Sequence, residues 1–128
     1  MRVLALDYGA ARTGVAISDP TGTISRPLEV VERAAAPAGL ARLGTIVREH
    51  EVELVVVGMP LTLRGEHGAQ AEETTAFVEA LRAELEVAVE TYDERFTTAL
   101  AARAGGGFDE DARAAAHLLE DYLRSVRS

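Results

Sequence analysis

The sequence predicts an α/β fold: a mixed five-stranded sheet, with a three-strand antiparallel meander followed by parallel strands, and helices on both faces. Two unbroken apolar runs, Val3–Leu6 and Leu54–Val57, are typical of strands covered on both faces. Segments with apolar residues at helical spacing alternate with strands in the rest of the chain. A strand–helix–strand connection requires a right-handed crossover and a parallel neighbour, so the later strands should be parallel.

The meander occupies the N-terminal part of the chain. The first strand ends at Asp7, and Gly9 and Gly14 are expected to mark the turn into a second strand. Residues 19–22, Asp-Pro-Thr-Gly, have the composition of a type I turn. A third strand follows, and Pro27 within it predicts an edge position because proline cannot donate to the ladder. The apolar members expected in this third strand are Ile24, Leu28, Val30 and Val31.

The remaining elements are helices and strands in alternation. Apolar spacing predicts a helix from Pro37 to His50, a strand around residues 53–58 and a helix from about Ala69 to Leu85. A fifth strand is expected over Val87–Tyr92, then a short helix near residues 97–104 and a last helix capped by Asp109. The acidic residues of the helix beginning at Ala69 should form a solvated outer face.

The last helix carries a charged residue at the head of its apolar face. Asp111 precedes Ala115, Leu118, Leu119 and Tyr122 at spacings of 4, 7, 8 and 11, which place these residues on one face. Asp111 should therefore point toward the sheet. A carboxylate in that position needs a partner, such as a metal ion or the helix N-terminus itself.

Composition limits the class of protein. The 128 residues, 48% of them hydrophobic, suit one globular domain spanning 1–128. There is no Cys, no long apolar run and no room for a signal peptide before the first strand, so we expect a cytoplasmic protein with no membrane partner. The net charge is −8, and all thirteen basic residues are Arg, which suits bidentate phosphate contacts. An acidic chain repels nucleic acid in bulk, so such binding must be local or metal-assisted.

Three acids stand out at the expected sheet edge: Asp7 after the first strand, Glu94 after the fifth, and Asp111 on the last helix. Each alone is a weak signal, and Asp7 could simply begin an Asx-type turn. They converge if the first and fifth strands run in the same direction and the last helix packs across their ends. Three close carboxylates require cations, and Mg²⁺ prefers oxygen ligands. A pair of such ions is an established device for phosphodiester cleavage.

Four motifs extend this pattern over most of the chain. They are Leu6-Asp7-Tyr8-Gly9 with Arg12-Thr13-Gly14-Val15-Ala16 and Ser18-Asp19; Val57-Gly58-Met59-Pro60 with Gly65; Asp93-Glu94-Arg95 with Thr97-Thr98 and Ala101; and Asp111 with Ala114-Ala115, Leu119 and Tyr122-Leu123. In this order they resemble the YqgF-type family of bacterial RuvC-like nucleases, which implies a ribonuclease-H-like fold. Family members are described as candidate Holliday junction resolvases and as candidate nucleases for the 5′ end of pre-16S ribosomal RNA.

The resemblance implies roles for individual residues. By motif matching, Asp7, Glu94 and Asp111 fall on the family's metal-binding, catalytic acids, which would bind Mg²⁺ or Mn²⁺. Arg12, Arg64 and Arg95 are candidate phosphate contacts, and Arg95 could instead pair with Asp93 or Glu94. One departure is the short segment over residues 105–110, where relatives usually have a longer basic stretch that could clamp nucleic acid.

Several interpretations remain open at this point. The favoured one is a metal-dependent endonuclease acting on structured nucleic acid, most specifically precursor ribosomal RNA, with a resolvase acting on branched DNA as its alternative. A non-catalytic ribosome-assembly or transcription factor is the second class, and it draws on the −8 charge and the missing basic stretch. An actin-like or sugar kinase is set aside because those ATPases need two such domains. Monomer and homodimer both remain possible.

Overall fold

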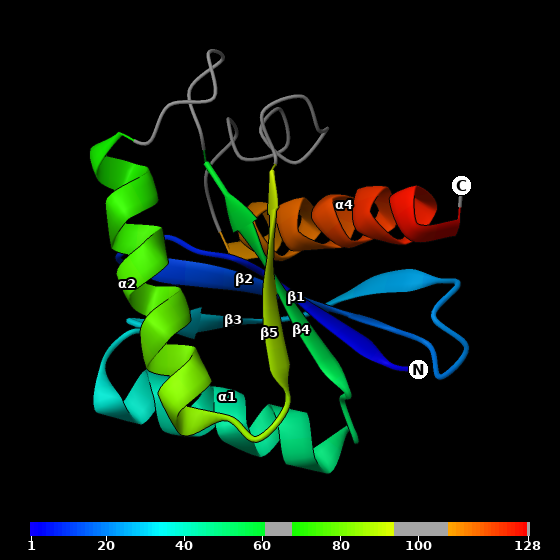
Figure 1. Ribbon diagram of the computed structural model, residues 1–128, viewed down its shortest axis with the longest axis horizontal. Helices are drawn as coiled ribbons and strands as arrows, with labels where there is room; N and C mark the ends of the chain where they lie inside the picture. Colours follow the sequence, from blue (N-terminus) through cyan, green and yellow to red (C-terminus); the bar gives the residue numbers. More distant parts are fainter. Residues whose placement is uncertain (61–67, 94–107, 128) are drawn as a thin grey trace.

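The computed structural model describes residues 1–60, 68–93 and 108–127 (Figure 1). In chain order the elements are β1 (Val3–Asp7), β2 (Arg12–Ser18), β3 (Ser25–Glu32), α1 (Pro37–Glu49), β4 (Leu54–Met59), α2 (Ala69–Glu84), β5 (Ala88–Asp93) and α4 (Phe108–Arg127). The short helix expected after the fifth strand falls outside the described residues. None of the helices in the described part of the chain has the length and apolar character needed to cross a membrane.

The five strands form one mixed sheet in the order β3-β2-β1-β4-β5. β1, β2 and β3 pair antiparallel, whereas β4 is parallel to both β1 and β5. The predicted meander and the predicted parallel strands are therefore both confirmed. β1 and β4, which carry the two unbroken apolar runs, are buried along their whole length in the middle of the sheet.

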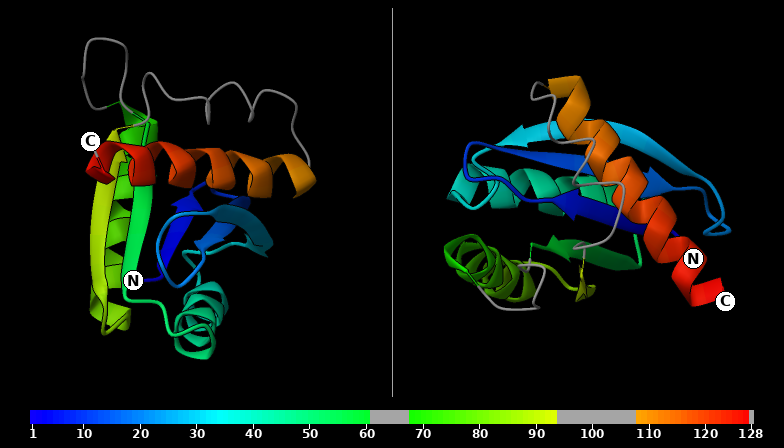
Figure 2. Two further views of the ribbon diagram at one scale, coloured as in Figure 1. Left: turned by 90° about the vertical axis from the view of Figure 1, so that its right-hand side faces the viewer. Right: turned by 90° about the horizontal axis from the view of Figure 1, so that it is seen from above.

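The two faces of the sheet are covered by different helices (Figure 2). Leu4 and Leu6 of β1 join the core beneath α1 and α2, which also contains Leu43 and Phe77. The alternate positions Val3 and Ala5 instead join the core beneath α4. This division follows from the period of two along a strand, which sends successive side chains to opposite faces. The fold thus confirms helices on both faces.

Two details of the meander differ from the expectation. Ile24 lies outside β3 and is 66% exposed, because its N–H donates to the carboxylate of Asp19 and its carbonyl accepts from the Asp19 N–H, which keeps it in the turn. Gly14 lies inside β2, not in the turn before it. The reason for a glycine there is steric: a Cβ atom at Gly14 would lie 1.8 Å from the carbonyl oxygen of Asp111.

Both edges of the sheet carry local features in addition to the regular strand pairing. β3 contains Pro27, as expected for an edge strand, and its register with β2 shifts between Val15 and Ala16. On the other edge, Arg82 of α2 donates from Nε and Nη2 to the backbone carbonyl of Val89 in β5, at 3.2 and 2.9 Å. Each edge of the sheet is thus modified by one side chain.

The close packing at Gly14 leads to a stability prediction. Gly14→Ala should lower the free energy of unfolding by about 2 kcal/mol or more, because α4 must move away from β2 to admit the methyl group. Gly44→Ala in α1 is the control, since the nearest atom to an added Cβ there is the flexible end of Arg48, 3.3 Å away and one turn further along the same helix. That change should be neutral or stabilising by up to about 1 kcal/mol. Urea unfolding of both variants measures the difference, and equal effects would contradict the packing argument.

Candidate active site

The site begins with a carboxylate at the end of the central strand β1. Asp7 is the last residue of β1 and is 3% exposed. Its position in the strand alternation places it on the same face as Val3 and Ala5, which is the face that α4 covers. Asp7 is therefore more than the start of an exposed turn: its carboxylate is held beneath the start of a helix from the far end of the chain.

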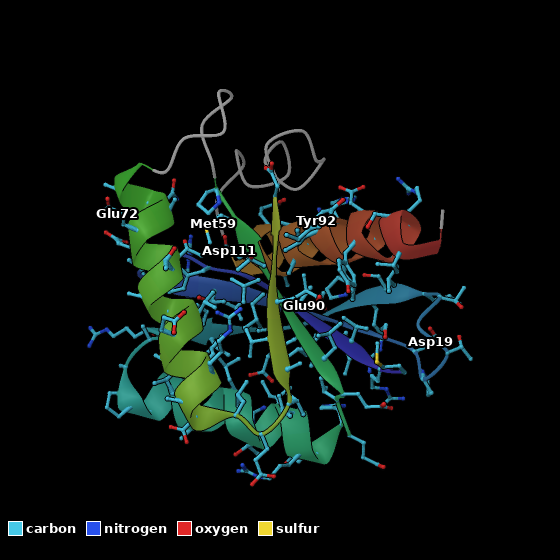
Figure 3. All side chains as sticks on the ribbon, viewed as in Figure 1. Asp19, Met59, Glu72, Glu90, Tyr92 and Asp111 are labelled. Atoms are coloured by element: carbon cyan, nitrogen blue, oxygen red, sulfur yellow. The ribbon has the colours of Figure 1, made fainter. Side chains whose placement is uncertain are left out.

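The second acid, Asp111, reaches the same place through the packing of α4. Asp7 pairs directly with Gly14 across the antiparallel β1–β2 ladder, and the backbone of Asp111 rests on Gly14. Figure 3 shows Asp111 at the start of α4, at the end of the sheet toward which β4 and β5 run. Two of the three predicted acids therefore meet at one edge and on one face of the sheet.

Asp111 has a cationic partner that we did not predict. Nε of Arg12, the first residue of β2, lies 3.0 Å from Oδ2 of Asp111. Within the described residues Oδ2 of Asp111 is buried and accepts no hydrogen bond of good geometry, so its close contact is this charge pair. The Arg12 and Asp111 side chains are 34% and 18% exposed, and pairs this close to solvent typically contribute about 1 kcal/mol or less.

A signal for this pair is present in the sequence. Arg12 and Gly14 are two residues apart on one strand, so their side-chain positions share a face. If Gly14 makes room for α4, then Arg12 must project beside the same helix. The sequence predicts only a phosphate contact for Arg12, and the structure gives its guanidinium a protein partner as well.

Behind Asp7, the next residue anchors the turn to the opposite face. The ring of Tyr8 stacks on Phe77 of α2, with ring centroids 4.4 Å apart and planes 21° apart. Beside it, Thr13 is fully buried, and its hydroxyl lies 3.4 Å from both the N–H and the carbonyl of Gly9. These contacts hold the loop after Asp7 between the sheet and α2, a role that our sequence interpretation did not assign.

Three predicted site residues lie outside the described part of the chain: Glu94, Arg64 and Arg95. The strand that precedes Glu94 is described, and its last residue, Asp93, pairs with Met59 at the end of β4. β1, β4 and β5 run parallel, so the ends of the first and fifth strands point the same way, as the convergence of the acids requires. Among the residues that are described, no group of three or more His, Cys, Asp and Glu could hold a metal ion.

The described donors suit an oxygen-preferring cation. Asp7 and Asp111 are carboxylates on one face of the sheet edge, and the chain contains no thiolate. A buried carboxylate close to a second acid requires nearby positive charge, and here part of that charge comes from Arg12. Such a donor set fits Mg²⁺ or Mn²⁺ better than zinc or a softer metal.

The arrangement of sheet and helices defines a RuvC-like, ribonuclease-H-like fold. The structure of Thermus thermophilus RuvC in complex with a Holliday junction substrate matches all of this chain and 96% of its own chain, with a TM-score of 0.63 and 19% sequence identity. Within this class, the family described as "RuvX: Holliday junction resolvase" matches residues 1–125. The chain belongs to this RuvX family, and the resemblance to YqgF-type proteins is confirmed.

Curated relatives add a second name for the family. A protein of Nocardia farcinica is 49% identical over 110 residues, covering 80% of this chain and 61% of that protein's length. A protein of Rubrobacter xylanophilus is 46% identical over 130 residues, covering 95% of this chain and 91% of its own. Both carry the name "Putative pre-16S rRNA nuclease".

The environment of Tyr8 leads to a titration prediction. Burial, followed by the negative charge of Glu73, raises the pKa of Tyr8 above its usual value of 10.0. Because the folded pKa exceeds that of the unfolded chain, the phenol contributes stability below about pH 10 that is lost as the pH rises through the folded pKa.

The measurement is the ultraviolet titration of tyrosine ionisation in the wild type and in Tyr8→Phe. The difference between the two curves isolates the ionisation of Tyr8, which should occur at a higher pH than that of a free tyrosine. Tyr122, whose pKa is also raised by burial and by Glu90, contributes equally to both curves and cancels. A difference curve centred at or below pH 10 would show that the stacked ring is not held as described.

Proposed function

We propose that this chain is a metal-dependent endonuclease that cleaves phosphodiester bonds in the 5′-end processing of pre-16S ribosomal RNA. The observation that carries the proposal is the meeting of Asp7, buried at the end of β1, with Asp111 at the start of α4. The names of the relatives support the substrate. We further propose that residues 1–128 act as one catalytic domain in the cytoplasm, as a monomer or a homodimer.

In this proposal Asp7, Glu94 and Asp111 would together hold Mg²⁺ or Mn²⁺. When bound, the metal supplies positive charge that activates the attacking water and stabilises the leaving oxygen. Asp7 contributes a rigid ligand, because the strand and the overlying helix fix its position. Asp111 contributes a second ligand. The backbone of Asp111 packs against Gly14, so the distance of Asp111 from β1 is fixed as well.

The arginines would hold the substrate backbone. Arg12 lies beside Asp111, and its side chain is partly exposed to solvent. A substrate phosphate bound at the metal would therefore lie close to the Arg12 guanidinium. Arg64 and Arg95 complete the proposed phosphate contacts. Local cations are needed because the net charge is −8, and binding should therefore weaken steeply as salt concentration rises.

A DNA substrate is the second candidate. The description of the matched family names a Holliday junction resolvase, and the fold matches a RuvC bound to such a junction. A symmetric junction would favour a two-fold dimer, whereas an RNA processor has no such requirement. The choice between the two substrates is open to direct measurement.

Substitution of the two described acids tests the metal site. Asp7→Asn and Asp111→Asn keep the shape of the side chain but remove a ligand charge, so each should reduce cleavage about 100-fold or more. Asp121→Asn is the matched control: Asp121 lies on the same helix, ten residues beyond Asp111, and pairs with Arg124 at 3.4 Å. Cleavage rates with Mg²⁺ should be close to wild type for the control. Unchanged cleavage by Asp7→Asn would exclude its catalytic role.

The substrate is tested with a labelled precursor ribosomal RNA fragment and a labelled four-way DNA junction, each with Mg²⁺, with Mn²⁺ and with chelator. Metal-dependent cutting of the RNA is the expected result, and cutting of the junction alone would favour the resolvase. If folded wild-type protein cuts neither substrate but binds RNA without metal, the chain is a non-catalytic interaction protein.

A further inference from the structure

Arg12 is the counter-ion of Asp111 at the proposed metal site. Its Nε lies 3.0 Å from Oδ2 of Asp111, and that oxygen is buried. The backbone of Asp111 is in turn packed on Gly14, opposite Asp7. The guanidinium therefore neutralises the carboxylate of Asp111, which lies at the same partly buried edge of the sheet as the second acid, Asp7.

The two members of this ion pair differ in their freedom to move. Asp111 has a short side chain on a helix whose backbone cannot approach or leave β2 without disturbing the core beneath α4. Arg12 has a long side chain at the first residue of β2, and 34% of that side chain is exposed. If another cation takes the Asp111 carboxylate, Arg12 is therefore the partner that can move away.

We propose that Arg12 is a placeholder for the metal. Its guanidinium pairs with the Asp111 carboxylate in the metal-free protein and is released when a divalent cation binds there. Guanidinium and metal compete for the same carboxylate oxygen, and their like charges repel each other at short distance. After release, the guanidinium is positioned to contact a substrate phosphate beside the metal. The inference rests on the proposed function, since it requires a metal at Asp7 and Asp111, and it makes Arg12 a positioning residue.

A thermodynamic cycle between Arg12 and the metal tests this. The unfolding midpoint of wild type and Arg12→Gln is measured in chelator and in saturating Mn²⁺. In chelator the variant should melt about 3–6 °C lower, because the charge of Asp111 has lost its partner. In Mn²⁺ most of this difference should vanish, because the metal has already displaced Arg12. By reciprocity, the variant should bind Mn²⁺ about three- to tenfold more tightly, as measured by calorimetry.

Two further variants serve as controls. Arg12→Lys keeps the positive charge and should retain a Mn²⁺ affinity closer to that of the wild type. Arg42→Gln removes an ion pair on the other face of the sheet, where Nε and Nη2 of Arg42 lie 2.9 and 2.6 Å from the carboxylate oxygens of Glu29. Its effect on the unfolding midpoint should be the same with and without Mn²⁺.

The outcomes separate this inference from the proposed function. An equal loss of stability for Arg12→Gln in chelator and in Mn²⁺, with unchanged or weaker Mn²⁺ binding, would overturn the placeholder and leave the metal site standing. Failure of the wild type to bind Mn²⁺ would overturn both. Coupling between Arg12 and Mn²⁺ in a protein that cleaves neither nucleic acid would support the placeholder and reject the nuclease.

Discussion

The contact between the backbone of α4 and β2 at Gly14 is the constraint on which the rest of the site depends. A helix can approach a strand this closely only where the strand residue has no side chain. That approach seals the core formed by Val3, Ala5 and the apolar stripe of α4. It also fixes Asp111 near Asp7, although the two are 104 positions apart in the sequence. Structural stability and the geometry of the acids therefore have one origin.

The sequence predicts the strands and helices well because their signals are local. The unbroken apolar runs identify β1 and β4 as buried strands. The helical spacing of the apolar residues in the last helix correctly predicts that Asp111 faces the sheet. Errors arise where a distant or side-chain interaction decides the outcome. Glycine is typical of turns, but Gly14 is required inside a strand because α4, from the other end of the chain, packs against it. Ile24 looks like a strand residue, yet hydrogen bonds to Asp19 hold it in the turn.

The candidate site was predictable in part for the same reason. Asp7 and Asp111 could be proposed from their places at a strand end and on a helix face, and the resemblance to a family then singled them out. The pairing of Arg12 with Asp111 was missed, because the spacing of Arg12 and Gly14 on one strand indicates it only once α4 is known to pack on Gly14. The third acid, Glu94, follows β5, whose direction beside β4 agrees with the prediction, and its own role remains a proposal.

The two edges of the sheet have a consequence for how copies of this protein can meet. An exposed edge strand is a template to which another chain can add a strand. On β3, Pro27 has no backbone N–H to donate, and on β5, Arg82 binds the carbonyl of Val89 and places a charge there. Both features oppose continuation of the sheet from one molecule into the next. Both edges therefore disfavour β-aggregation of the concentrated protein, and side-chain surfaces are the better route for association between copies.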